Sequence, residues 1–126
     1  MVASLVDSSI VIDILRGHAP ALQWLQAQNQ KVGITRYVWL EVLEGCSNKQ
    51  EQRTASRTLN KFDLTPITNA DLEWASTAFL KHYLKSNTDP FDCLIAATSH
   101  RLQIPLYTRN LKHFKPLLGK LAQKPY

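Results

Sequence analysis

Residues 2–17 read VASLVDSSIVIDILRG, and this stretch decides the fold class. Val2–Val6 is a short apolar run of the length of a buried strand, and Asp7 follows it directly. The apolar residues after Asp7 recur at helical spacing until Gly17, which is a common residue at a helix end. The stretch therefore predicts a buried strand, an acidic residue at the end of that strand and a helix immediately after it.

Strands and helices are predicted to alternate along the rest of the chain. Further strands are predicted at residues 31–34, 62–67 and 105–107. Helices are predicted at residues 8–16, 19–28, 35–45, 48–61, 70–84 and 89–101, with a short one from residue 110. This alternation predicts an α/β fold, a three-layer α/β/α sandwich with a mostly parallel central sheet, and a single domain over residues 1–126.

The order of the elements also predicts where a ligand would bind. In open α/β sheets, ligands bind at the carboxyl ends of the strands. Asp7 and the segment Thr108–Asn110 each follow a predicted strand directly. We therefore expect these two distant parts of the chain to meet at one edge of the sheet. Asn69 is expected to cap the helix at 70–84.

The composition is that of a globular protein with an ordinary core. Of the 126 residues, 44% are hydrophobic and 20% are charged. No apolar run approaches the roughly 18–20 residues that cross a bilayer, and no signal peptide is recognisable. Cys46 and Cys93 lie in separate apolar segments and indicate free thiols rather than a disulfide. We therefore expect a cytoplasmic protein without membrane association.

Charge is distributed unevenly along the sequence. The formal net charge is +5, and no Asp or Glu follows Asp92. The same carboxyl-terminal stretch contains several cationic side chains, namely Arg101, Arg109, Lys112, Lys115, Lys120 and Lys124. This asymmetry favours an anionic partner, either nucleic acid or an acidic protein, although a solvated basic surface would give the same pattern.

Glu41 is the acidic residue that its predicted helix accommodates least easily. Its neighbours from residue 37 to residue 43 are all apolar or aromatic. A carboxylate on a largely buried helix is costly unless it is paired or binds a metal ion. Glu44 is the glutamate of this helix that we expect at the surface. Glu41 is therefore a candidate site residue.

Asp7 and Asp92 have structural explanations beside the functional one. Asp7 precedes a helix and could serve only as its N-cap. Asp89 is expected to cap the helix at 89–101, whereas Asp92 lies on the inward-facing stripe of that helix with Ile95. We therefore assign Asp89 to the helix cap and Asp92 to the candidate site.

Several carboxylates that converge without matching arginines indicate a cation. Such groups repel one another strongly unless a positive charge lies among them. Oxygen ligands favour Mg²⁺ or Mn²⁺, and neither the histidines nor the cysteines have the spacing of a zinc site. The sequence has no Gly-x-Ser-x-Gly motif and no phosphate-binding glycine loop. Metal-assisted phosphodiester chemistry is the interpretation that remains.

Four segments of the chain together resemble the motifs of PIN-domain nucleases. They are LVDSS at 5–9 with Ile12-Asp13 and LRG at 15–17, WLEVLEG at 39–45, DCLIAAT at 92–98, and TRN at 108–110 with Phe114. The segments occur in the family's order and span nearly the whole chain. The length and the simple architecture look most like the VapC-type toxins of bacterial toxin–antitoxin pairs.

The resemblance implies a metal site. Asp7, Glu41 and Asp92 fall on the acidic metal ligands of the family, and Asn110 falls where many members have an aspartate and others an asparagine. His113 stands where an acidic residue often precedes the phenylalanine. Both departures should weaken a second metal position, so the number of ions stays open.

The resemblance also implies supporting residues and an activity. Ser9 matches the small polar residue that supports the metal or its water, and Thr108 and Arg109 match residues expected near the scissile phosphate. The implied activity is that of an endoribonuclease that hydrolyses structured RNA, such as transfer RNA or ribosomal RNA, through water activated by Mg²⁺ or Mn²⁺. The implied partners are the RNA substrate, a cognate antitoxin and a second copy of the chain in a homodimer.

One alternative of another class stays open at this point. A catalytically weak PIN-like module could bind RNA or protein without cleaving it. Asn110 stands where many family members have a carboxylate. Because this residue lacks the negative charge, the non-cleaving alternative stays open.

Overall fold

The central sheet consists of five short parallel strands. The computed structural model describes residues 1–126, and its strands are β1 (Ser4–Val6), β2 (Val32–Thr35), β3 (Asp63–Thr65), β4 (Leu106–Tyr107) and β5 (Ala122–Gln123). Their order across the sheet is β3-β2-β1-β4-β5, and every neighbouring pair is parallel. The prediction of a parallel central sheet is confirmed. The strand β5 was not predicted from the sequence.

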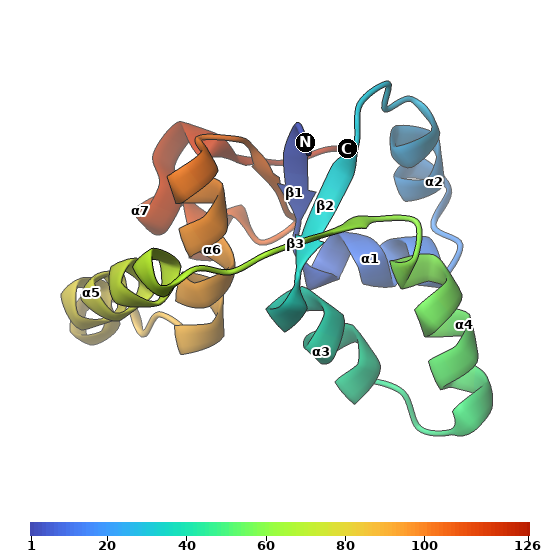
Figure 1. Ribbon diagram of the computed structural model, residues 1–126, viewed down its shortest axis with the longest axis horizontal. Helices are drawn as coiled ribbons and strands as arrows, with labels where there is room; N and C mark the ends of the chain where they lie inside the picture. Colours follow the sequence, from blue (N-terminus) through green and yellow to red (C-terminus); the bar gives the residue numbers. More distant parts are fainter.

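Seven α-helices surround the sheet. They are α1 (Ser8–Leu15), α2 (Ala19–Gln26), α3 (Arg36–Glu44), α4 (Lys49–Leu59), α5 (Asn69–Ser86), α6 (Pro90–Leu102) and α7 (Leu111–Leu118), and a short 3₁₀ helix (Gly119–Leu121) follows α7. Helices α1, α2 and α4 lie on one side of the sheet, and α5, α6 and α7 lie on the other (Figure 1). The arrangement is the predicted α/β/α sandwich, because helices must cover both faces of a parallel sheet.

The strand order places a topological switch point at β1 and β4. From β1 the chain proceeds through β2 to β3 in one direction, and β4 and β5 extend the sheet in the other. In the register of β1 and β4, Val6 lies opposite Tyr107, so Asp7 and Thr108 follow at the same edge. Crevices at such switch points are where α/β sheets bind ligands. The two distant segments therefore meet where the sequence predicted.

The hydrophobic core fills the space between the sheet and its helices. All three residues of β1 and all four of β2 are buried, as expected of central strands covered on both faces. The core continues into α1 with Ile10 and Val11, into α6 with Ile95, and into α7 with Phe114. The strand β1 is thus fixed from both sides, and with it the position of Asp7.

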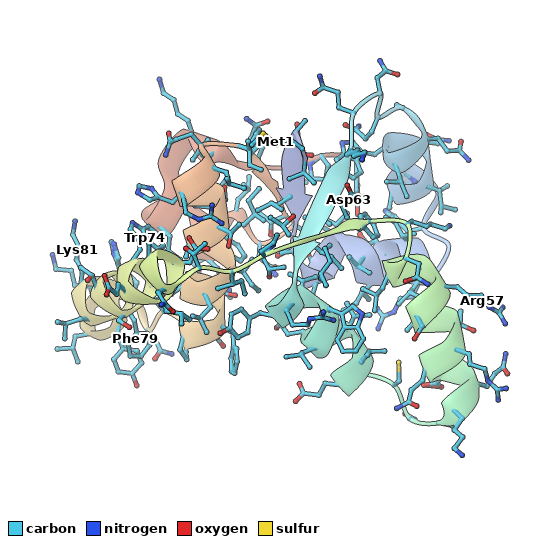
Figure 2. All side chains as sticks on the ribbon, in the orientation of Figure 1. Met1, Arg57, Asp63, Trp74, Phe79 and Lys81 are labelled. Atoms are coloured by element: carbon cyan, nitrogen blue, oxygen red, sulfur yellow. The ribbon has the colours of Figure 1, made fainter.

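Helix α5 packs against α6 on the side away from the sheet (Figure 1). The Trp74 ring of α5 stacks on the His100 ring of α6 with centroids 4.7 Å apart. Figure 2 shows Trp74 on the side of α5 near α6, and Phe79 and Lys81 farther out along α5. The outer turns of α5 therefore lie at the margin of the molecule.

The cap of α5 differs from the predicted one. Thr68, not Asn69, is the N-cap residue, since its hydroxyl accepts a hydrogen bond from the Asp71 N–H at 3.2 Å and the Asp71 carboxylate accepts one from the Thr68 N–H at 3.0 Å. This reciprocal capping box satisfies two backbone donors at once, whereas Asn69 as cap would satisfy one. Asn69 is instead the first helical residue.

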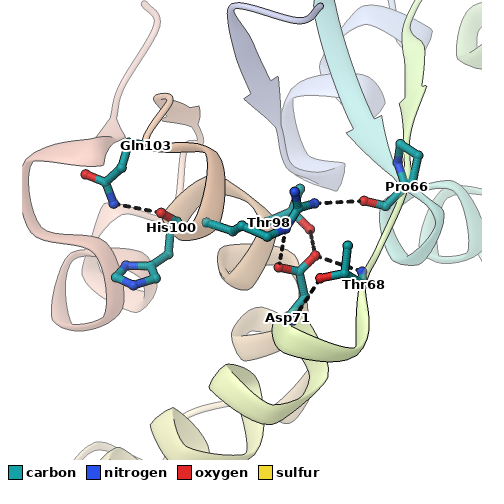
Figure 3. A network of polar contacts seen from close by, with 7 residues as sticks. Pro66, Thr68, Asp71, Thr98, His100 and Gln103 are labelled. Atoms are coloured by element: carbon teal, nitrogen blue, oxygen red, sulfur yellow. Dashed lines mark hydrogen bonds and ion pairs between the residues drawn. The ribbon is translucent and has the colours of Figure 1, made fainter.

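Asp71 also joins α5 to α6. Its buried carboxylate accepts hydrogen bonds from Arg101 at 2.8 Å and from Thr98 at 3.1 Å, and Arg101 donates further to the Pro66 carbonyl (Figure 3). Burial raises the pKa of Asp71, but the hydrogen bonds from Arg101, Thr68 and Thr98 outweigh it and hold the pKa below its ordinary value. The network fixes the helix pair on the sheet.

None of the helices combines the length and the apolar character needed to span a bilayer.

Candidate active site

Asp7 lies at the carboxyl end of β1 and is the N-cap of α1. Its Oδ1 accepts hydrogen bonds from the backbone N–H and the hydroxyl of Ser9, and its Oδ2 accepts one from the Thr108 hydroxyl at 2.7 Å. The residue is only 3% exposed. Burial raises the pKa of Asp7, and the hydrogen bonds from Ser9 and Thr108 oppose that rise. Capping and a functional role are therefore compatible, because the cap fixes how the carboxylate is oriented.

The segment after β4 completes the surroundings of Asp7. The fully buried Thr108 hydroxyl accepts a hydrogen bond from the Asn110 N–H at 2.9 Å, and the Arg109 N–H donates to the Ser9 hydroxyl at 3.1 Å. Ser9, Thr108 and Arg109 are thus joined to Asp7 by one network. Asn110 is exposed, and its side chain makes no capping hydrogen bond to α7. Its position is set through its backbone.

Glu41 extends from α3, which begins where β2 ends and is capped by Thr35. The side chain is half-buried, and its Oε1 is buried without any hydrogen-bond partner. The expectation that α3 is largely buried holds only in part, because Leu40 is 51% exposed and Val38 and Val42 alone are buried, while Tyr37, Trp39 and Leu43 pack against the core partly buried. Glu41 nevertheless lies at the edge of the buried face.

Burial and two neighbouring carboxylates raise the pKa of Glu41. Burial, followed by the charges of Asp92 and Asp7, raises the pKa of Glu41 to about 7, while the Ser8 hydroxyl opposes the rise. Asp7 and Asp92 come from β1 and α6, so three separate elements bring negative charge to one place. An orphaned oxygen in such a place is costly unless a cation or a donor reaches it.

Asp92 lies in the first turn of α6 and is half-buried. Asp89 caps this helix by accepting a hydrogen bond from the Phe91 N–H at 2.7 Å and is itself exposed, so the predicted division between cap and inward-facing carboxylate is confirmed. The Nδ1 of His113 lies 3.5 Å from Asp92 Oδ2. Burial and the charges of Asp89 and Asp7 raise the pKa of Asp92 to about 6, against the lowering effect of His113.

The donor set suits a hard divalent cation. Asp7, Glu41 and Asp92 offer only oxygen atoms, the ligands that Mg²⁺ and Mn²⁺ prefer. No group of three or more His, Cys, Asp or Glu side chains is gathered closely enough to hold a metal ion by itself. Mg²⁺ usually binds through one or two carboxylates and keeps several waters, so a closed protein cage is not required. The unpartnered Glu41 oxygen is the feature that fits such an ion.

An open polar pocket adjoins Asp92. Its volume is about 590 Å³, and it is lined by the turn 86–89, Asp92 and the α7 residues Lys112, His113 and Pro116. Lys112 forms no ion pair with any carboxylate. A cation and a histidine beside a carboxylate cluster provide room and charge for an anionic, hydrogen-bonding ligand.

Asp13 is a buried site residue that the sequence interpretation did not single out. It accepts hydrogen bonds from the Arg109 guanidinium and from the Tyr126 hydroxyl. Burial and the neighbouring Asp13 raise the pKa of Tyr126 above its ordinary value. The sequence does contain an indication that Asp13 faces inward. Asp13 lies on the buried side of α1 with Ile10 and Ile14, at the same helical spacing that identified Asp92 on α6.

The fold and the sequence together define the class of protein to which this chain belongs. The sequence matches the PIN domain family over residues 4–115, and the chain belongs to that family. PIN domains of VapC-type toxins are in general nucleases. No curated protein sequence matches the chain.

Solved structures of toxin–antitoxin systems share the fold. A toxin–antitoxin complex from Klebsiella pneumoniae matches with a TM-score of 0.81 and 25% identity, over 98% of both chains. VapBC2 from Rickettsia felis, bound to a DNA fragment from the promoter, matches with a TM-score of 0.77 and 20% identity over 91% of this chain and 92% of that one. VapBC-1 from nontypeable Haemophilus influenzae matches with a TM-score of 0.78 and 17% identity, over 99% and 98%. The resemblance to VapC-type PIN-domain proteins is thereby confirmed.

Proposed function

We propose that the chain is a metal-dependent endoribonuclease, the toxin of a type II toxin–antitoxin pair. The single observation that carries this proposal is the buried Glu41 oxygen without a hydrogen-bond partner, in a place where the charges of Asp92 and Asp7 raise the pKa of Glu41. A protein that needed no cation there would be more stable with a neutral side chain at position 41. Membership of the PIN domain family supports the same reading.

Asp7, Glu41 and Asp92 would hold Mg²⁺ or Mn²⁺. When bound, such an ion lowers the pKa of a water molecule and neutralises charge on the phosphate during hydrolysis. The protein's own contribution is orientation: Ser9 and Thr108 fix both oxygens of Asp7, and α3 and α6 carry the other two carboxylates. Asn110, which stands where many family members have an aspartate, adds no charge, so the proposed ligand set has three carboxylates.

RNA is the proposed substrate, and structured transfer RNA or ribosomal RNA is the proposed class. The pocket beside Asp92 carries Lys112 and His113, and the chain after Asp92 contains no acidic residue. A phosphate backbone placed there would meet the unpaired charge of Lys112, with His113 beside Asp92 as a further hydrogen-bonding group. Lys112 and His113 would therefore hold the strand next to the bond that is cut.

An antitoxin and a second copy of the chain are the proposed protein partners. The similar structures are described as toxin–antitoxin or VapBC complexes, which supports an antitoxin partner. Leu80 and Leu84 are 82% and 92% exposed on one face of the outer turns of α5, one helical turn apart. Exposed apolar side chains in such a row favour a self-complementary contact between two copies. The free thiols of Cys46 and Cys93 agree with the proposed cytoplasmic location.

A cleavage assay tests the proposed activity. Purified protein is incubated with total transfer RNA in Mg²⁺ or Mn²⁺, with and without a chelator. We expect discrete cuts that disappear with the chelator and in Asp7→Asn and Asp92→Asn, whereas Glu44→Gln, on the exposed side of α3, cuts like the wild type. Wild-type protein that binds RNA but never cuts it would favour the non-cleaving binding module instead.

A further inference from the structure

The side chain of Arg109 is directed to α1 and not only to the solvent. Its Nη1 lies 3.1 Å from both carboxylate oxygens of Asp13, and the Tyr126 hydroxyl donates to Asp13 Oδ2 at 2.5 Å. The Asp13 side chain is 9% exposed, and that of Arg109 is 51% exposed. A buried carboxylate that accepts from a cation and a hydroxyl is held firmly. Arg109 and Tyr126 are thus both tied to the middle of α1.

The backbone of Arg109 is tied to Asp7. Its N–H donates to the Ser9 hydroxyl, which in turn donates to Asp7 Oδ1. The residue before it, Thr108, donates to Asp7 Oδ2 and accepts from the N–H of the residue after it, Asn110. Both oxygens of Asp7 therefore depend on where the segment 108–110 lies.

We propose that Asp13 is a positioning residue: by binding Arg109 and Tyr126 it holds the segment 108–110 against Asp7 and so fixes the orientation of that carboxylate. The inference rests on the proposed function, in which Asp7 is a metal ligand. In this role Arg109 acts through Asp13, and it is not an independent donor to the RNA phosphate. The buried charge of Asp13, which is costly in itself, has its explanation in this network.

A double-mutant cycle separates positioning from direct contact with RNA. Asp13→Asn, Arg109→Gln and the double variant are compared with Asp63→Asn, a matched change at an exposed aspartate of the edge strand β3. We expect kcat to fall by roughly tenfold in each single variant with little change in KM, because small misplacements of a site residue cost rate. The double variant should be no slower than either single one, since both break the same contact.

Other kinetic results would overturn the inference. If the two substitutions had additive effects, or if Arg109→Gln raised KM while Asp13→Asn changed nothing, Arg109 would contact RNA on its own. If Asp63→Asn lowered kcat as much as Asp13→Asn, the effect would not belong to the network.

A second measurement does not need nuclease activity. The N–H groups of Arg109 and Asn110 are both hydrogen-bonded in this network, so their hydrogen exchange reports on the segment directly. We expect faster exchange at these two amides in Asp13→Asn and unchanged exchange in β2. Unchanged exchange at both amides would overturn the inference. If the wild type never cleaved RNA, the proposed function would fail. The exchange measurement would then test the positioning role of Asp13 by itself.

A milder variant covers the case in which Asp13→Asn does not fold. Tyr126→Phe removes one donor to Asp13 and leaves the Arg109 contact in place. We expect a change in the same direction in both kcat and exchange, smaller than that of Asp13→Asn. Exchange and kcat equal to those of the wild type would exclude Tyr126 and its contact with Asp13 from the positioning role.

Discussion

The Thr108 hydroxyl donates a 2.7 Å hydrogen bond to Asp7, although 101 residues separate the two in sequence. The parallel pairing of β1 with β4 brings them together, because Val6 and Tyr107 lie opposite each other just before them. The orientation of Asp7 is therefore fixed by the fold itself, before any ligand binds.

Asp7→Asn should separate activity from stability. An asparagine has the same size and does not bury a charge, but its single carbonyl oxygen can accept from Ser9 or from Thr108 and not from both, so the two effects on stability oppose each other. We expect cleavage of RNA to fall at least about 100-fold through loss of a metal ligand, with a Tm within about 4 °C of the wild type. Reaction rates and thermal denaturation of the same preparation measure both. An active Asp7→Asn protein would remove Asp7 from the catalytic site.

The metal-free protein should lose stability as the pH rises through the pKa values of Asp92 and Glu41. Folding raises these pKa values from 3.8 to about 6 and from 4.5 to about 7. Within that window the folded state binds more protons than the unfolded state, so the free energy of unfolding falls with increasing pH. We expect a lower Tm at about pH 8 than at about pH 5 in the presence of EDTA, and recovery at the higher pH when Mg²⁺ or Mn²⁺ is added. A Tm that rises over this range, or that the ions leave unchanged, would contradict the proposed site.

Glu41→Gln tests the unpartnered oxygen, with Glu44→Gln as its control on the same helix. Removing the charge at position 41 relieves repulsion from Asp7 and Asp92. We expect the metal-free Glu41→Gln protein to gain about 1 kcal/mol at alkaline pH and to lose most of the stabilisation by Mg²⁺. Denaturant titrations with and without Mg²⁺ measure this difference. Equal behaviour of the two variants would show that Glu41 has no special role.

Lys112→Ala should weaken RNA binding through charge alone. Measured in the Asp7→Asn background, where RNA stays intact, the affinity should fall for all sequences, and the slope of log K against log salt should drop by about one. Lys49→Ala, on α4 at the other side of the sheet (Figure 1), should leave the slope unchanged. An equal loss in both variants would indicate diffuse attraction rather than a path beside Asp92.

Asp71→Asn should lower stability without affecting catalysis. The substitution breaks the charge pairing with Arg101 and weakens the cap at Thr68, so we expect a loss of about 2 kcal/mol in the free energy of unfolding. Because the pKa of Asp71 is lowered in the folded state, its contribution is present near neutral pH and is lost as the pH falls through the acidic range. Denaturant unfolding at several pH values measures this dependence. A variant that is as stable as the wild type would contradict the structural role of the network.

The parts of the fold that depend on local pattern were predictable from sequence. The strand before Asp7, the helix after it and the alternation of strands and helices follow from periodicity, which requires no knowledge of distant residues. The cap at Asp89 followed from the Asp-Pro pair in the same way. The strand β5 could not be recognised, since Ala122–Gln123 lies between Lys120 and Lys124 and has no apolar run like that around β4, which is equally short.

The ion-pair partners of buried carboxylates were not predictable, although the meeting of Asp7 with the segment 108–110 was. Asp13 and Asp71 are buried because Arg109 and Arg101 reach them, from 96 and 30 residues away. The stripe of α1 marked Asp13 as inward-facing, but no periodicity indicates which cation will pair with it. The exposure of Leu40 was missed for the related reason that burial of α3 depends on what packs against it.

The strand order also determines when, during synthesis, the surroundings of Asp7 can assemble. Strand β4 inserts beside β1, the first strand to be made, so a growing chain that ends before Thr108 has Asp7 without the hydroxyl that orients it. Contacts between residues so far apart form late, because a long loop must close first. If the chain cuts RNA as proposed, the ribosome that makes it would thus have translated past Thr108 before a competent site could assemble.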